Sequence, residues 1–435
     1  MQKRAIALSV ALLASPSLGS AADSSAGPQV NLGAILDGRY QDGEREFSET
    51  EDGFGLGHTE ISLDANIDHR FRGRLTTVLE SHDGDIELEL EEAFVETLGL
   101  PGGLNLRAGR MLSQFGYLNS RHLHEDDFPH RPGAYRAYLG DHYFDDGLGA
   151  ELVLPTNQYV KFGFEAFDGD KLAASSVPGH ARDTVNVLGG QIKTGGDIND
   201  SNSWQLGVSL LHNRSGSAMA SFDLPDHDHH DEHDEDHDDG HDADHHRHAG
   251  DHDEHDDDHE DDHGHEHGNG NGHGHAHGPA VTGENLYGVD FTWKWAPDGN
   301  YREQNVVFTA EYLLLDDLLD NTLAQVQGAP DDLSGWYLSL AWQFAPQWTA
   351  AVRYGEAETF HSHDVGLHDG DLEGQYDVDR LKEIDLSLAW SPSHFSTVRA
   401  AYTRETQRVH GHSNDENIFM LQYVMSLGAH GAHRF

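Results

Sequence analysis

The chain has 435 residues, no cysteine and a formal net charge of −50 at pH 7. Without cysteine it can form neither disulfides nor thiolate metal sites. The acidic excess excludes nucleic acid as a partner, because like charges repel, and it favours a protein that handles cations.

Residues 1–22 have the pattern of a secretory signal peptide. Two basic residues precede the apolar stretch 5–13, and small residues follow it, so we expect cleavage after Ala21 or Ala22. No segment of the sequence approaches the ~18 continuous apolar residues that a membrane-spanning helix needs. If the remaining chain, 23–435, enters a membrane, it must do so as a β-barrel.

Apolar and polar residues then alternate along sixteen segments of the chain. A period of two places one set of side chains on each face of a β-strand. A transmembrane barrel needs this pattern, with one face toward lipid and the other toward water, although a soluble β-sandwich has the same period. The predicted strands are 29–41, 56–68, 71–81, 86–98, 103–112, 147–155, 158–167, 184–194, 203–213, 284–296, 303–315, 333–345, 347–358, 382–391, 394–406 and 416–428.

The links between these strands tend to alternate in length. Short links such as 69–70 and 155–158 alternate with long ones, above all 113–146, 214–283 and 359–381. Outer-membrane barrels have short periplasmic turns, long outer loops and girdles of aromatic residues at the interfaces. Six tryptophans lie near the short links: Trp204, Trp293, Trp295, Trp342, Trp348 and Trp390. We therefore expect an all-β protein, a transmembrane antiparallel β-barrel of about 16 strands in a Gram-negative outer membrane, with long extracellular loops.

The inward faces of these strands carry many charges, which a dry core could not hold. They indicate a water-filled lumen, and sixteen strands are wide enough for an aqueous channel. The charged residues expected to face the lumen are Asp64, Arg72, Arg74, Glu87, Glu89, Arg107, Lys161, Glu165, Asp290, Lys294, Arg353, Glu383, Asp385 and Arg399.

Residues 226–277, within the link 214–283, hold eighteen histidines and twenty-one acidic residues with a single arginine. Neutral imidazole ligates Zn²⁺, Cu²⁺ and Ni²⁺, and carboxylates can complete the shell. A solvated acidic linker would not need so many histidines, so we expect this extracellular loop to bind divalent metal, Zn²⁺ first, with Cu²⁺ or Ni²⁺ as competitors. The expected metal ligands are His227, His229, His230, His233, His237, His241, His245, His246, His248, His252, His255, His259, His263, His265, His267, His273, His275 and His277.

Three other links are expected to add ligands around the outer mouth of the pore. A negative surface that is dense in ligands concentrates cations. The histidines are His361, His363 and His368 in link 359–381 and His410 and His412 in link 407–415, and link 42–55 is rich in glutamate.

The link 113–146 follows the fifth predicted strand, where the corresponding loop of many sixteen-stranded porins folds inward. It combines both charge signs with imidazoles, so we expect it to narrow the channel; the alternative is an outer lid with scattered surface histidines. His122, His124 and Glu125 could form a transit site for a cation. The candidate constriction residues are His122, His124, Glu125, Asp126, Asp127, His130, Arg131 and Arg136.

Several motifs resemble a family of outer-membrane proteins linked to zinc supply, often labelled zinc-regulated TonB-dependent receptors and similar in layout to the phosphate-selective porins. The motifs are LNLRAGR at 104–110, SQFG at 113–116, DFPHRP at 127–132, YRAYLGD at 135–141, the stretch 147–156 and the ending 426–435. The last residue, Phe435, keeps the alternation of the final predicted strand and resembles the terminal aromatic by which outer-membrane barrels are assembled.

The resemblance implies zinc transport across the outer membrane. A TonB-dependent receptor holds a plug domain within about twenty-two strands, whereas the first predicted strand here begins at residue 29, with no plug ahead of it. We therefore expect a passive, porin-like channel.

No Walker loop, helical His-Glu-x-x-His motif or nucleophile elbow occurs in the sequence, and we expect no enzyme. The leading hypothesis is a porin-like channel that captures zinc on its His-rich loop and lets it pass to the periplasm. Two alternatives stay open: a general or differently selective porin whose loop only buffers metal, and a non-transporting surface metal-binding protein. The expected partners are outer-membrane lipid, divalent metal ions, the barrel-assembly machinery and, by analogy with porins, further copies of the chain in a homotrimer.

Overall fold

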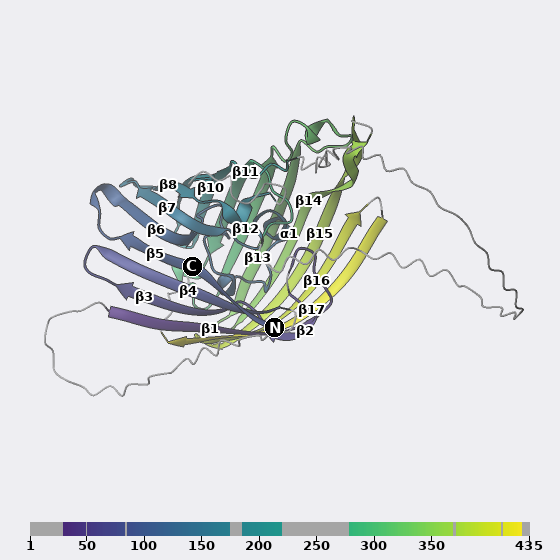
Figure 1. Cartoon of the computed structure of the whole chain (residues 1–435). Coiled ribbons are helices and arrows are strands. Elements are labelled where there is room, and N and C mark those ends of the chain that lie inside the picture. The colour runs from purple at the N-terminus through teal and green to yellow at the C-terminus, as the bar shows by residue number, and fades with distance from the viewer. Residues whose placement is uncertain are drawn as a thin grey trace, which may run out of the picture.

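The structure, a computed structural model, is a closed antiparallel β-barrel (Figure 1). It describes residues 29–48, 50–82, 85–174, 185–219, 278–368, 371–409 and 412–428. The strand segments are β1 (Gln29–Asp42), β2 (Gly53–Leu56), β3 (Thr59–Asn66), β4 (Phe71–His82), β5 (Asp85–Thr97), β6 (Leu104–Leu112), β7 (Phe144–Val153), β8 (Tyr159–Phe167), β9 (Val187–Asn199), β10 (Asn202–Asn213), β11 (Asn285–Trp295), β12 (Asn305–Asp316), β13 (Asp332–Ala345), β14 (Trp348–His368), β15 (Asp371–Ser393), β16 (Ser396–Val409) and β17 (His412–Gly428). Pairing of β1 with β17 closes the sheet.

Sixteen strands surround the barrel. β2 and β3 both pair with β1, β2 along 38–41 and β3 along 29–35, so they are two pieces of one interrupted strand. The prediction of an antiparallel barrel of sixteen strands is therefore confirmed. The predicted signal peptide 1–22, the His-rich residues 226–277 and Phe435 lie outside the described residues.

Two of the predicted outer loops are wrong. The links 359–381 and 407–415 are largely strand, because β14 continues to His368 before β15 begins, and β16 continues to Val409. The extensions pair residue by residue, as His361 does with Asp377. A β-ladder is held by backbone groups alone, so it continues beyond the point where the apolar alternation of side chains ends.

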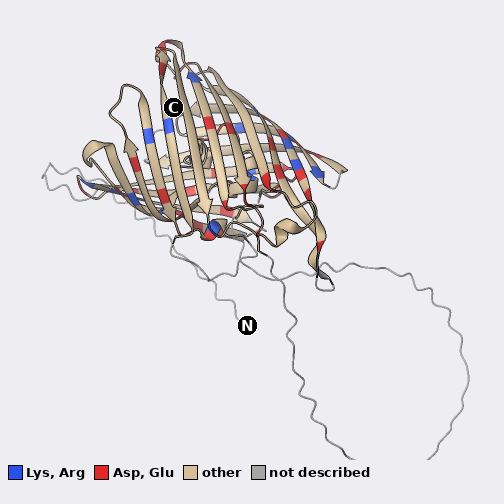
Figure 2. Ribbon diagram, turned by 90° about the horizontal axis from the view of Figure 1, so that it is seen from above, with Lys and Arg blue, Asp and Glu red and all other residues tan. Residues whose placement is uncertain are grey.

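The outward faces of the strands are apolar and the inward faces are polar. On β11, Tyr287 and Val289 are 41% and 46% exposed, whereas the neighbouring Asp290 is fully buried. Acidic and basic residues are distributed along many of the strands (Figure 2). An apolar outer surface around a polar interior is the arrangement of transmembrane barrels.

The two ends of the barrel differ in their connections. At the short-link end, where β1 begins and β17 ends, strands are joined by links such as 200–201 and 346–347. At the long-link end lie the links 113–143, 214–284 and 317–331. The exposed tryptophans Trp342, Trp348 and Trp390 are all at the short-link end, as an interfacial girdle requires.

Residues 113–143, which join β6 to β7, lie inside the barrel, and we call them the lumenal segment. They include the helix α1 (Gly133–Leu139), all of whose residues are buried. Phe115, Tyr135 and Tyr138 of the segment belong to an apolar cluster with inward-facing side chains of β10 to β15. Among the described residues, no helix is long and apolar enough to cross a bilayer.

Many inward-facing charges of the strands contact the lumenal segment. Arg136 of α1 lies 3.2 Å from Glu383 and 3.1 Å from Glu405. Arg353 of β14 donates a hydrogen bond of 2.9 Å to the carbonyl oxygen of His130. The predicted inward orientation of these charges is confirmed, and the lumenal segment contacts many of them.

Candidate metal centre in the lumen

A break in the barrel wall turns a histidine toward the lumen. β2 ends at Leu56 and β3 begins at Thr59, and the side chain of His58, within the break, is only 6% exposed. Gly57 allows β1 to pack closely against this break, because a Cβ atom at position 57 would lie 2.4 Å from a carboxylate oxygen of Asp37. Glycine therefore lets the Asp37 side chain lie close to the wall here, and the break re-aims the residue that follows it.

A bulge on β5 places two consecutive glutamates on the inside. Thr76 of β4 pairs with Glu92 and Thr77 pairs with Leu90, so Glu91 is an extra residue in the ladder. A bulge shifts the alternation of side chains by one residue. Glu91 and Glu92 consequently both face the lumen, and they are 1% and 4% exposed.

The lumenal segment supplies a second imidazole. The buried Asn119 ties its two ends together: the side-chain amide donates to the carbonyl oxygens of Ser113 and Tyr143 at 2.8 Å each and accepts from the Tyr143 N–H at 2.7 Å. A 3₁₀ turn, Leu123–Glu125, follows within this clamped loop. His122 precedes the turn and reaches the wall formed by β3 and β5.

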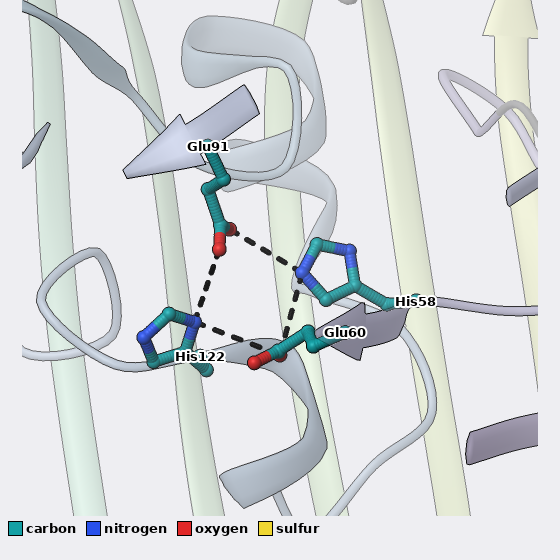
Figure 3. A group of neighbouring side chains, drawn as sticks. All are labelled: His58, Glu60, Glu91 and His122. Carbon is teal, nitrogen blue, oxygen red and sulfur yellow. Dashed lines mark ion pairs between the residues drawn. The ribbon is translucent and has the colours of Figure 1, made fainter. Parts of the chain in front are cut away.

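Four side chains, His58, Glu60, Glu91 and His122, converge on one point, and their ion pairs form a closed ring (Figure 3). We call them the lumenal cluster. His58 Nε2 lies 3.5 Å from Glu60 Oε1 and 3.3 Å from Glu91 Oε1. His122 Nδ1 lies 3.6 Å from Glu60 Oε1 and 3.1 Å from Glu91 Oε2. Ligand atoms around a tetrahedral Zn²⁺ ion are about 3.3 Å apart, given bonds of about 2.0–2.2 Å, so these separations suit a single bound ion.

Several facing atoms of the lumenal cluster form no hydrogen bond of good geometry. His58 Nε2, His122 Nδ1 and Glu91 Oε2 are buried and have no such bond among the described residues. Buried polar atoms without partners cost free energy. A divalent cation at the centre of the ring would satisfy all of them together and neutralise the two carboxylates.

The second nitrogen of each imidazole is held by another carboxylate. His58 Nδ1 lies 2.9 Å from Glu80 Oε1, and His122 Nε2 lies 3.3 Å from Glu92 Oε2. A metal-bound histidine commonly donates its second N–H to a carboxylate, which fixes the tautomer and the orientation of the ring. Glu80 and Glu92 are therefore placed as outer partners of the two imidazole ligands.

The electrostatic field at the lumenal cluster favours a positive charge. Burial alone would lower the pKa of His122, but the carboxylates of Glu60 and Glu91 outweigh it and raise the pKa well above its usual range. A proton and a metal ion would therefore compete for the same place, since only the deprotonated imidazole can ligate.

Two further histidines and a cavity adjoin the lumenal cluster. His124 Nδ1 lies 2.7 Å from Glu60 Oε1, and His142 Nε2 lies 2.8 Å from Glu91 Oε1. A cavity of about 280 Å³ reaches the cluster, and its polar lining includes His58, Glu80, Glu87, Asp141 and His142. A cation in this cavity would meet imidazole and carboxylate ligands in succession. When several binding sites lie next to one another, an ion can leave a tight site by moving to the neighbouring one.

The residues predicted for a constriction do not form one site. His122 and His124 lie together, with ring centroids 5.7 Å apart, and both reach Glu60. Glu125, predicted to join them, instead lies 3.6 Å from Arg121.

The other predicted constriction residues lie elsewhere in the lumen. Asp126 pairs with Arg131 at 3.1 Å, and His130 Nε2 lies 2.9 Å from Gln41 Oε1. Asp127 lines a second cavity of about 290 Å³, with Lys294 and Arg353 among its other residues. Arg136 belongs to the ion pairs that hold α1 to β15 and β16.

His58, Glu60 and Glu91 were not among the candidate ligands predicted from the sequence. His58 and Glu60 are two residues apart, as side chains on one face of a strand are, and the adjacent acidic pair at 91–92 interrupts the alternation of β5. These features indicate inward-facing polar groups and a bulge. They do not indicate that Glu60 of β3 and Glu91 of β5 both lie next to His122 of the lumenal segment.

The His-rich residues 226–277 lie outside the described residues, but the chain directly after them is described. Gly278 packs against Gly140 at the end of α1, where a Cβ on Gly140 would lie 2.9 Å from the carbonyl carbon of Gly278. His142 follows two residues later and lines the cavity beside the lumenal cluster. The chain that follows the His-rich residues therefore packs on the part of the lumenal segment that leads to this cavity.

Comparison with known proteins places the fold among the porins. No family model matches the chain. An uncharacterized protein of Aquifex aeolicus (strain VF5) is 24% identical over 400 residues, which are 88% of this chain and 70% of that protein. The outer membrane channel DcaP of Acinetobacter baumannii is similar with a TM-score of 0.51 at 13% identity, over 93% of this chain and 99% of that one. OmpT of Vibrio cholerae in its trimer form is similar with a TM-score of 0.50 at 8% identity, over 92% and 100%.

Proposed function

We propose that this protein is an outer-membrane channel that captures divalent metal, Zn²⁺ above all, on residues 226–277 and passes it through the lumenal cluster to the periplasm. The observation that supports this most is the ring of His58, Glu60, Glu91 and His122 inside a porin-type barrel. Two imidazoles and two carboxylates suit Zn²⁺ better than Ca²⁺ or Mg²⁺, which prefer shells made of oxygen alone.

The route follows the placement of ligands along the barrel. The long-link end faces outward, as in other barrels with long outer loops. A cation held by the His-rich residues moves to the cavity lined by His142 and Glu80 and then into the lumenal cluster. The second cavity, lined by Asp127 and Lys294, lies on the way to the short-link end and the periplasm.

A non-transporting metal-binding protein is the second candidate. The observation that favours it is the lumenal segment, whose Tyr135 and Tyr138 are packed into a buried apolar cluster inside the barrel. Under this alternative the ion stays in the lumenal cluster and ties the segment to the wall.

Vesicles that contain the purified protein separate the two candidates. We expect Zn²⁺ to enter them, reported by a zinc-sensitive dye inside, at a rate that falls in Glu91→Gln. K⁺ flux through the same vesicles distinguishes a metal channel from a general porin, because a general porin would pass K⁺ freely and respond little to Glu91→Gln. Absence of any ion flux would favour the non-transporting candidate.

The assembled protein is proposed to be a homotrimer in outer-membrane lipid, inserted by the barrel-assembly machinery. OmpT of Vibrio cholerae, which shares the fold, has been solved in a trimer form. Cross-linking in detergent tests the number of copies.

Deleting residues 226–277 is expected to leave an assembled barrel that binds far fewer Zn²⁺ ions. Apart from alanine the segment contains no apolar residue, so it contributes little to folding. Metal analysis after gel filtration counts the ions, and heat-modifiable migration reports assembly. A variant with all eighteen histidines of the segment changed to asparagine keeps its length and carboxylates and isolates the contribution of imidazole. An unchanged zinc count in both variants would show that the segment is not the main binder.

Zinc binding by residues 226–277 is expected to fall steeply between about pH 7 and about pH 5, because histidine titrates near pH ~6.5 and carboxylates near ~4. Over this range the net charge of the segment rises from about −20 to about −2. Ligands are lost to protonation while the attracting field weakens. The difference in zinc count between the full chain and the deletion variant gives the number of Zn²⁺ ions bound by residues 226–277 at each pH. Full retention at about pH 5 would rule out imidazole ligands and favour carboxylate sites of the calcium type.

A further inference from the structure

The extension of β14 and β15 beyond the barrel carries a second group of metal-ligand side chains. His361 and His363 lie two apart on β14, and Asp377 and Asp379 lie two apart on β15. His361 is directly opposite Asp377. Residues two apart share a face of a strand, and residues paired across strands share it as well, so all four side chains lie on one face of the hairpin.

The donor atoms of three of these residues converge. His363 Nε2 lies 2.9 Å from His361 Nε2 and 3.2 Å from Asp377 Oδ2. His361 Nε2 lies 4.0 Å from the same carboxylate oxygen. The separations bracket the value of about 3.3 Å between ligand atoms around tetrahedral Zn²⁺.

An outer carboxylate orients the first imidazole. His361 Nδ1 lies 2.6 Å from Asp379 Oδ2, and Asp379 is 7% exposed. With Nδ1–H donated to Asp379, His361 presents the lone pair of Nε2 to the point where His363 and Asp377 meet. This is the carboxylate–histidine–metal arrangement in which the outer group fixes the tautomer of the ligand.

We propose that His361, His363 and Asp377 form a second divalent-metal site, of the Zn²⁺, Ni²⁺ or Cu²⁺ class, at the long-link end of the barrel. Its side chains are 25%, 40% and 37% exposed, whereas those of the lumenal cluster are at most 11% exposed. Three protein ligands leave a fourth position for water or for another ligand. The site therefore exchanges its ion with solvent more readily than the lumenal cluster does. Metal binding at this second site does not depend on whether the barrel transports metal.

The site is tested in the full chain by histidine footprinting with diethyl pyrocarbonate, with Zn²⁺ as the probe and peptide mapping by mass spectrometry. We expect Zn²⁺ to protect His361 and His363 together, and to leave His212, a histidine of the same end of the barrel, as reactive as before. Asp377→Asn should abolish the protection. Asp379→Asn should keep it but require about tenfold more Zn²⁺, because outer partners of ligands typically change affinity by 10–100-fold.

The test separates this site from the lumenal cluster. Glu91→Gln should leave the protection of His361 and His363 unchanged, whether or not it alters zinc flux. Equal reactivity of the two histidines with and without Zn²⁺, or full protection in Asp377→Asn, would overturn the proposal. Asp377 is partly exposed and makes no contact in the apolar cluster of the lumen, so its variant is expected to assemble, and heat-modifiable migration verifies this.

Discussion

Glu91→Gln is expected to weaken Zn²⁺ binding at the lumenal cluster by about 100-fold or more. Loss of an outer partner alone costs about 10–100-fold. Glu91 would be a direct ligand, and it also supplies negative charge to both His58 and His122. The substitution should not unfold the barrel, since glutamine keeps the shape of the side chain and can still form hydrogen bonds to the surrounding histidines His58, His122 and His142.

The affinity is best measured in the protein that lacks residues 226–277, by competition with a chromophoric chelator, so that the His-rich ligands do not mask the lumenal cluster. Glu151→Gln is the matched control, because Glu151 is a strand glutamate that pairs with Arg107 and Lys161 away from the cluster. Glu92→Gln should give a smaller loss of about tenfold, as expected for an outer partner. Equal affinity in Glu91→Gln and the control would refute zinc binding at this cluster.

Arg136→Met is expected to loosen the lumenal segment and to raise the conductance of the barrel in planar bilayers. Arg136 is fully buried and pairs with Glu383 and Glu405. Removing one partner of a buried ion pair leaves charge uncompensated and costs about 3–5 kcal/mol. Methionine retains most of the apolar stem, so the change acts mainly on charge. Proteolysis within 113–143 should increase in parallel.

Arg110→Met provides the comparison for this experiment. Arg110 pairs with Asp146 at 2.8 Å, but both side chains are partly exposed, and such surface pairs contribute about 0–1 kcal/mol. The conductance and protease resistance of the Arg110→Met variant should match those of the unaltered protein. If Arg136→Met behaves in the same way while migrating as an assembled barrel, the ion pairs of α1 do not hold the lumenal segment in place.

Zinc binding at the lumenal cluster and the anchoring of the lumenal segment are expected to depend on each other. Three residues of the lumenal cluster come from the wall, and His122 alone comes from the lumenal segment. A bound ion would therefore join the segment to β3 and β5. Zn²⁺ is expected to restore part of the protease resistance that Arg136→Met loses, because ligand binding stabilises the state that binds it.

The barrel itself could be predicted because its pattern is local. Along β11 and β15 most apolar residues face outward and most polar ones face the lumen, so a period of two over ten residues predicts the strand and its faces. The His-rich residues 226–277 are likewise evident from composition alone. Prediction was wrong where the backbone ladder outlasts the side-chain pattern, as in the extensions of β14 and β15.

The lumenal cluster could not be predicted, because its ligands come from three separate parts of the chain. The break at His58 and the bulge at Glu91 each shift the alternation by one residue, and the fold of residues 113–143 decides which histidine reaches them. The sequence by itself determined an acidic barrel with a segment rich in metal ligands, because strand periodicity and composition are properties of neighbouring residues. Only the tertiary structure decided that His58, Glu60, Glu91 and His122 meet, because closing the sheet and packing the lumenal segment into it bring together residues far apart in the chain.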